Sequence, residues 1–171
     1  MTLQPVPSVM ERSAVISPCG QYRYRLWRKW GESQRRPLLW VMLNPSTADG
    51  QVDDRTICRC IDFSKRFGYG AMWVGNMYGY RSTDPAVLAR LDLLKGYGPH
   101  NARHLAEMAA ESDRIVVAWG SHLMAAGESE RFTRKILAHP AGLWCLGTSR
   151  AGAPRHPLYL AKDTPLQRYE P

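Results

Sequence analysis

The fold is decided by residues 38–46, which read LLWVMLNPS. Residues 38–43 are continuously apolar, a pattern typical of a short β-strand that is buried on both faces of a parallel sheet. Asn44 and Pro45 end this run abruptly. Because proline fixes its own φ and disfavours the helical conformation of the residue before it, we expect the strand to end here, with the Asn44 side chain held at its tip.

Strand and helix patterns continue outward from this run in both directions. Upstream, a Pro-Cys-Gly turn separates two β-prone stretches, which predicts an antiparallel hairpin from residues 13–17 and 21–30. Downstream, short apolar runs predict strands at residues 71–74, 114–119 and 143–146. Helical patterns alternate with them at residues 53–67, 99–111 and 129–138. This alternation predicts an α/β fold: a three-layer α/β/α sandwich with a central parallel four-stranded sheet, preceded by an N-terminal antiparallel β-hairpin.

The composition fits one folded domain rather than a disordered or membrane protein. The chain has 171 residues, of which 44% are hydrophobic and 22% are charged. We expect a single domain over residues 1–171, with a lead-in and hairpin at 1–37, a core at 38–160 and a tail at 161–171. No apolar run is long enough to span a bilayer and no signal-peptide pattern opens the chain, so we expect a cytoplasmic protein that does not contact membranes.

Charge and cysteine spacing narrow the possible partners. Twenty-three Lys and Arg residues against fifteen Asp and Glu residues give a net charge of +8, which favours a polyanion, most simply nucleic acid, as a partner. The cysteines at positions 19, 58, 60 and 145 have the spacing of neither a disulfide scaffold nor a zinc site. We therefore expect no cofactor and no dedicated metal site, although the acidic residues of segment 44–54 leave weak metal binding open. The oligomeric state is unknown at this stage.

The predicted sheet also says where a ligand binds. In an open parallel sheet, ligands bind beyond the carboxyl ends of the strands. We therefore expect the ligand site in the segments that follow the predicted strands, which are residues 44–54, 75–84, 120–127 and 147–160.

Segment 44–54 carries an amide, hydroxyls and carboxylates directly after the first core strand. Asn44 and Ser46 follow the strand, and Asp49, Asp53 and Asp54 cluster within one turn-rich stretch. Carboxylates near a reactive centre can act as general bases. The alternative is structural: Asn44 forms an Asx-type turn and the acidic residues cap the helix that begins near residue 53.

Segments 75–84 and 147–160 carry residues suited to nucleic acid. In the first, the Asn76 amide offers a donor and an acceptor to the edge of a base, and the tyrosines Tyr78 and Tyr80 offer faces on which a base can stack. In the second, arginines flank a His-Pro pair and could bind phosphates. The alternatives are that Asn76 satisfies backbone groups of a loop, and that the second segment packs its apolar residues on the sheet edge and exposes solvated arginines.

In chain order, these segments resemble the uracil-DNA glycosylase superfamily. The sequence VMLNPS at residues 41–46 is similar to the GINPG motif of one branch, and VGNM at residues 74–77 is similar to the strand that presents a base-reading asparagine. The sequence IVVAWGSH at residues 115–122 resembles the third strand with its glycine turn, and RHPL at residues 155–158 resembles the start of the HPSP loop. The chain is closer still to a bacterial and phage family that is marked by LNPSTAD and RHPLYL and has no settled activity.

The resemblance implies roles in catalysis for a few residues. Asn44 would position an attacking water, and His156 would hydrogen-bond the carbonyl oxygen of the departing base. One of Asp49, Asp53 and Asp54 could serve as a general base, an addition to the glycosylase pattern, and we favour Asp49 and Asp53. The chain departs from that pattern at Ser46, where GINPG has glycine, and at Leu158, where HPSP has serine.

The resemblance also implies binding roles. Asn76 would read the base edge, with Tyr78 or Tyr80 stacked on the base. Leu158 would fill the position vacated by a flipped nucleotide. The remaining substrate-binding residues are Pro45, Ser46 and Arg81, and the phosphate-binding residues are Arg150 and Arg155.

The sequence therefore predicts a DNA base glycosylase-like hydrolase that flips a modified or damaged base and cleaves its N-glycosidic bond. Two alternatives stay open. One is a module that binds a modified base or nucleic acid without cleaving it, and the other is an enzyme that acts on free nucleotides.

Overall fold

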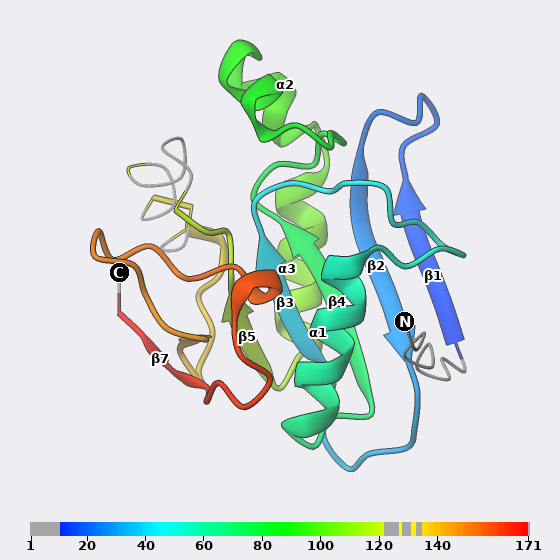
Figure 1. Cartoon of the computed structure of the whole chain (residues 1–171). Helices are drawn as coiled ribbons and strands as arrows, with labels where there is room; N and C mark the ends of the chain where they lie inside the picture. The colour runs from blue at the N-terminus through cyan, green and yellow to red at the C-terminus, as the bar shows by residue number, and fades with distance from the viewer. Residues whose placement is uncertain (1–10, 122–126, 128–130, 133–134, 171) are drawn as a thin grey trace, which may run out of the picture.

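The structure is a computed structural model that describes residues 11–121, 127, 131–132 and 135–170, and it contains one mixed β-sheet (Figure 1). Seven strands lie in the spatial order β1-β2-β4-β3-β5-β6-β7. Their bounds are β1 Glu11–Ile16, β2 Arg23–Lys29, β3 Leu38–Met42, β4 Ala71–Asn76, β5 Arg114–Val117, β6 Leu143–Cys145 and β7 Gln167–Tyr169.

The sheet differs from the one that the sequence predicts. The pairings β4–β3, β3–β5 and β5–β6 are parallel, whereas β1–β2, β2–β4 and β6–β7 are antiparallel. The predicted central four-stranded parallel sheet with a separate hairpin before it is therefore wrong, because the hairpin and the C-terminal strand join the same sheet. Strand β2 pairs with β4 from Leu26 opposite Val74 to Lys29 opposite Ala71. A period-2 pattern identifies a strand but not its neighbour, so the sequence could not show this pairing.

The predicted three-layer sandwich is also wrong. The described part of the chain contains three α-helices, α1 Arg55–Arg66, α2 Leu93–Tyr97 and α3 Asn101–Glu111, besides the 3₁₀ turns η1 Pro85–Arg90 and η2 Pro157–Tyr159. Only α1 and α3 lie along the sheet, and the short α2 lies beyond its end (Figure 1). Of the helix predicted at residues 129–138, residues 131–132 and 135–136 are helical, and residues 129–130 and 133–134 lie outside the described residues. In the described part of the chain, the edge strands thus lack the continuous helical layers that a doubly wound sandwich requires.

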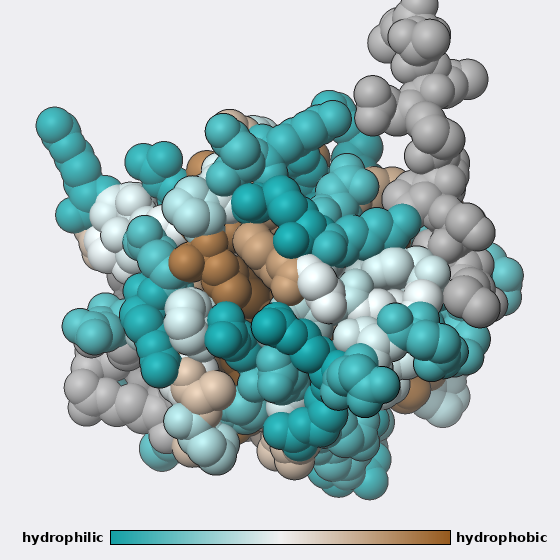
Figure 2. All heavy atoms as spheres, turned by 90° about the horizontal axis from the view of Figure 1, so that it is seen from below, coloured by the Kyte–Doolittle hydropathy of each residue, from teal (hydrophilic) through white to brown (hydrophobic). Residues whose placement is uncertain are grey.

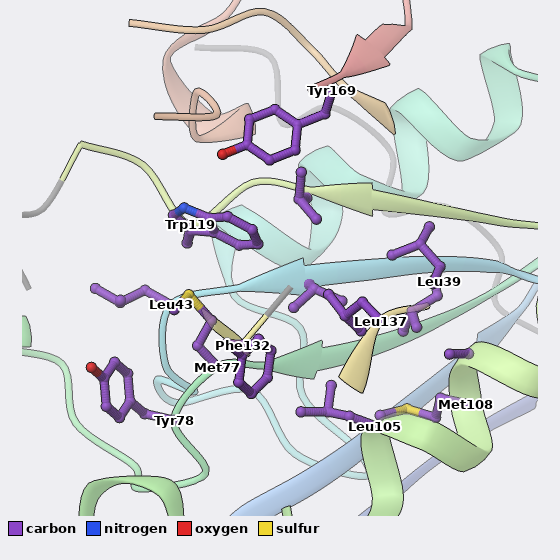
Figure 3. Close-up of a cluster of buried hydrophobic side chains, with 14 of the residues drawn as sticks. Leu39, Leu43, Met77, Tyr78, Leu105, Met108, Trp119, Phe132, Leu137 and Tyr169 are labelled. Carbon is purple, nitrogen blue, oxygen red and sulfur yellow. The ribbon is translucent and has the colours of Figure 1, made fainter. Parts of the chain in front are cut away.

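Strand β3 occupies the middle of the sheet and explains its apolar sequence. All five of its residues are buried, and alternate side chains face opposite sides. Leu38 and Trp40 belong to one buried apolar cluster, together with Ile57 of α1. Leu39 and Val41 belong to a second buried apolar cluster. Figure 3 shows that second cluster, to which Leu39 of β3 and Leu105 and Met108 of α3 belong.

The outer surface agrees with the charged composition. The face drawn in Figure 2, seen from below the view of Figure 1, is mainly hydrophilic, with a small hydrophobic area near its centre. None of the described helices is long and apolar enough to cross a lipid bilayer.

The chain changes direction across the sheet at β3. The segment that follows β3 leads to β4 on one side, and the chain later returns to β5 on the other side. Adjacent parallel strands whose connections leave in opposite directions form a switch point, where a crevice opens beyond their carboxyl ends. The switch point of this sheet lies at the ends of β3 and β5.

Candidate functional site

A cavity of about 670 Å³ lies at this switch point. The residues that follow β3 (Leu43, Asn44) and β5 (Trp119, Gly120) form part of its wall. The start of α1 and the loop that contains His156 form further parts of the wall. Its volume falls within the range of about 300–1,000 Å³ that is typical of small-molecule sites.

Asn44 is fixed at the tip of β3 by its own amide group. The side-chain Nδ2 donates to the carbonyl oxygens of Ser82, at 2.8 Å, and Pro45, at 3.2 Å. Both amide hydrogens are therefore used, and the side-chain Oδ1 is left as an acceptor that can bind a ligand or a water. The predicted Asx-type turn is not what holds Asn44, because its amide bridges two loops. Pro45 is buried and is not in the cavity wall, whereas Ser46 is.

His156 faces the same cavity from the loop after β6. The backbone N–H of Leu158 donates to its Nδ1 at 3.3 Å, so the neutral ring carries its hydrogen on Nε2. Burial lowers the pKa of His156, with a smaller opposing effect from Asp54. A neutral imidazole with Nε2–H as donor is the form that can hydrogen-bond a carbonyl oxygen. The pKa shift extends that form to lower pH than for an exposed histidine.

Arg23, the first residue of β2, lies in the cavity wall although no sequence pattern singles it out. It alternates with tyrosines in the predicted hairpin, which suggests an exposed side chain, yet it is only 2% exposed. Its Nη1 donates to the carbonyl oxygen of Ala48 at 2.6 Å, and its Nε has no hydrogen-bond partner among the described residues. Sequence reasoning missed this residue because burial at a strand end depends on which loop folds over it.

Trp119 is another wall residue to which the sequence analysis gave no role. It ends the apolar run of the third predicted strand, its side chain is 2% exposed, and its ring meets the Tyr169 ring edge to face at 5.8 Å (Figure 3). The indole Nε1–H is buried and has no partner among the described residues. The buried indole therefore adds an unused donor to a residue that lines the cavity.

Asn76 lies close to the cavity without lining it. It pairs in register with Met42, a wall residue on the neighbouring strand. A Cβ on Gly75 would meet Leu105 and Met108 of α3, so the next side chain, that of Asn76, points to the opposite, α1-covered face. Both polar atoms of Asn76 are buried and without a partner in the described part of the chain. The geometry leaves the predicted base-reading role untested.

The tyrosines of segment 75–84 lie apart from the cavity. Tyr78 is 1% exposed and stacks on Tyr97 with ring centroids 4.9 Å apart. Tyr80 packs edge to face on Tyr22. Arg81 donates to the carbonyl oxygen of Gly20 and is not in the wall. The wall residues from this segment are instead Ser82 and Thr83, and the Ser82 hydroxyl donates to the carbonyl oxygen of Asp84.

The three acidic residues of segment 44–54 have three different roles. Asp49 accepts the N–H groups of Gln51 and Val52, which lowers its pKa, and Asp53 forms an ion pair with Arg28 at 2.6 Å. Asp54 caps α1 by accepting the N–H of Ile57 at 2.9 Å. Of the three, only Asp54 lines the cavity, so the site carboxylate is not one of the two that the sequence favours, Asp49 and Asp53.

The basic loop divides between wall and surface. Arg155 and Leu158 line the cavity together with His156, whereas Arg150 is exposed and outside it. Tyr159, which is 84% exposed, is also a wall residue. Among the described residues, no group of three or more His, Cys, Asp or Glu side chains is placed to hold a metal ion.

The fold defines an α/β protein with a cavity at the switch point of a mixed sheet. The chain belongs to the family described as "Protein of unknown function (DUF1643)", whose sequence model matches residues 23–158. The match runs from the start of β2, at Arg23, to the loop that carries His156. No curated protein and no solved structure matches the chain. None of these comparisons tests the resemblance to the uracil-DNA glycosylase superfamily, which stays a prediction.

Proposed function

We propose that this protein binds a single nucleotide of DNA in the switch-point cavity and hydrolyses the bond between its base and its sugar. The observation that carries this proposal is the placement of Asn44 and His156 in one cavity wall. Asn44 presents an oxygen acceptor whose orientation its two amide hydrogen bonds fix. His156 presents a neutral Nε2–H donor.

These two groups suit the two ends of the reaction. Cleavage of an N-glycosidic bond develops positive charge on the sugar and negative charge on the leaving base. Asn44 Oδ1 would orient a water toward C1′ of the sugar, and His156 would stabilise the negative charge on a base oxygen. The water oxygen forms the new bond to C1′, and the electron pair of the C1′–N bond leaves with the base. We assign the proton released by the water to Asp54, the carboxylate in the wall.

The surroundings support a nucleic-acid substrate. The net charge is +8, and Arg155 lines the cavity beside His156. The exposed Arg150 lies on the same loop and is suited to a phosphate outside the cavity.

Base release tests the proposal directly. The protein would be incubated with single-stranded and duplex DNA that carries uracil, hypoxanthine or 5-hydroxymethyluracil, and free base would be measured by mass spectrometry. We expect release that Asn44→Ala reduces by roughly 100-fold or more, because the oriented water is lost. Thr47→Ala is the matched control, since Thr47 belongs to the same loop but is exposed and outside the wall. Folded wild-type protein that releases no base, or release that survives Asn44→Ala, would contradict the proposal.

A further inference from the structure

Arg23 is a buried cation without an anionic partner. No ion pair joins it to a carboxylate in the part of the chain that the structure describes. Its one hydrogen bond there is to the neutral carbonyl of Ala48, and its Nε has none. It thus carries a full charge at 2% exposure with most of its donor groups unused.

None of the nearby carboxylates in the described part of the chain forms an ion pair with Arg23. Asp53 pairs with Arg28, and Asp49 accepts two backbone N–H groups. Asp54 interacts electrostatically with Arg23 from a distance, but its side chain caps α1. The charged side chains in the cavity wall are therefore Arg23 and Arg155 against Asp54, a net charge of +1 with His156 neutral.

A buried charge of this kind is costly unless something pairs with it. Removing an ion from water costs several kcal/mol, which only a close counter-charge with good hydrogen bonds offsets. Burial lowers the pKa of Arg23 to about 10, so the group is still protonated at neutral pH. A guanidinium presents a planar fork of N–H donors that matches the two oxygens of a carboxylate or phosphate.

We propose that Arg23 is an anion-binding residue and that the ligand of this cavity carries an oxyanion, a carboxylate or a phosphate, which pairs with its guanidinium. The unpaired Nε1–H of Trp119 is a second buried donor in the same wall. This inference deepens the proposed function, on which it rests for the ligand being a nucleotide. Two sources of the oxyanion fit the chemistry: the phosphate of the nucleotide and an acidic substituent on its base.

Binding measurements test this inference separately from base release. Isothermal titration calorimetry would compare deoxyuridine, its 5′-monophosphate and 5-carboxydeoxyuridine. We expect at least one anionic compound to bind the wild-type protein ten-fold or more tightly than deoxyuridine. Preference for the monophosphate identifies the phosphate as the source, and preference for the carboxylated nucleoside identifies the base substituent.

Variants at Arg23 show whether this residue causes the preference. Arg23→Met should abolish the difference between anionic and neutral compounds, and Arg23→Lys should keep part of it, because lysine retains the charge but loses the fork. Arg90→Met is the matched control, because Arg90 is exposed and outside the wall. Equal affinity for neutral and anionic nucleosides, or a preference that survives Arg23→Met, would overturn the inference. Since binding is the readout, it can hold for a protein that releases no base, and base release can occur without it.

Discussion

Two arginines on the same strand, Arg23 and Arg28, are buried to the same degree and surrounded in opposite ways. Arg28 is 0% exposed and donates to Asp53 at 2.6 Å, with further hydrogen bonds to the carbonyl oxygens of Asp49 and Trp27. Arg23 is 2% exposed and has a single neutral acceptor. Both side chains donate hydrogen bonds to segment 44–54. Arg28 makes several of them and Arg23 makes one, and Arg23 also lines the cavity. The difference separates an arginine that builds the fold from one that is available to a ligand.

The largest effect that tests this contrast is on stability. Arg28→Met leaves Asp53 buried without its partner, so we expect the free energy of unfolding to fall by about 3–5 kcal/mol. Arg23→Met removes an unpaired charge and leaves one carbonyl without a donor, so we expect a change within about 1 kcal/mol. Urea unfolding of both variants at neutral pH measures the two values.

The control for this pair is Arg12→Met. Arg12 lies 3.7 Å from the other oxygen of Asp53 and is more exposed, so its removal should cost far less than that of Arg28. If Arg23→Met and Arg28→Met lower the stability equally, Arg23 is a structural residue and the contrast is wrong.

A third arginine of β2, Arg25, donates to a histidine, so its surroundings can be tested by the dependence of stability on pH. Its Nε donates to Nδ1 of His104 at 2.7 Å, which requires an unprotonated imidazole nitrogen. Burial and the nearby cations Arg25 and Arg103 lower the pKa of His104 to about 4. In the unfolded chain His104 takes up a proton near pH 6.5. The contribution of His104 to the stability is therefore fully present above pH 6.5 and is lost as the pH falls toward 4.

We therefore expect acid to lower the stability of the wild-type protein by up to about 3 kcal/mol through this group. His104→Phe, which keeps a ring stacked on Tyr24, should flatten the decline between pH 7 and pH 4.5 in urea unfolding. His100→Gln, at an exposed neighbouring histidine, is the control. A decline that is unchanged in His104→Phe would show that other groups cause it.

The smallest effect is expected when the negative charge of Asp54 is removed from the cavity wall. Asp54→Asn removes the cavity carboxylate but keeps an equally good cap for α1, so the stability should change little. Affinity for the anionic nucleoside should rise by about three- to ten-fold, because one repulsive charge is lost. Calorimetry measures this rise. Asp92→Asn, the same substitution at the cap of α2, should leave the affinity unchanged, and an unchanged affinity in Asp54→Asn would argue against an anion near Arg23.

Much of the secondary structure could be predicted because it depends on local pattern. The apolar run at residues 38–43 corresponds to β3, and the predicted helix at residues 53–67 contains α1 with Asp54 as its cap. Strand β7, three residues long, was missed and assigned to a tail, because so short a segment has no usable periodicity and is stabilised by its partner β6. The predicted sheet is wrong because the pairing of β2 with β4 depends on contacts between segments that are distant in the chain.

The candidate site shows the same division. The sequence predicts the segments after β3 and β6 as parts of a site because they follow the carboxyl ends of core strands and carry Asn44 and the His156-Pro157 pair. Tyr78 and Asp53 have residue types suited to a site, yet the structure uses one in the core and the other in an ion pair. Arg23 could not be found in this way, because nothing distinguishes it from Arg25 along the strand.

Local sequence patterns predict every strand except β7, the helices α1 and α3, and the loops that follow the core strands, because hydrophobic periodicity, proline and capping residues act over a few neighbouring positions. The seven-stranded mixed sheet, the pairing of Arg28 with Asp53 and the place of Arg23 in the cavity wall emerge only in the folded chain. These depend on contacts between segments distant in the chain. The free energy of a buried charge is set by which groups surround it, and those groups come together only when the segment at residues 44–54 folds over strand β2.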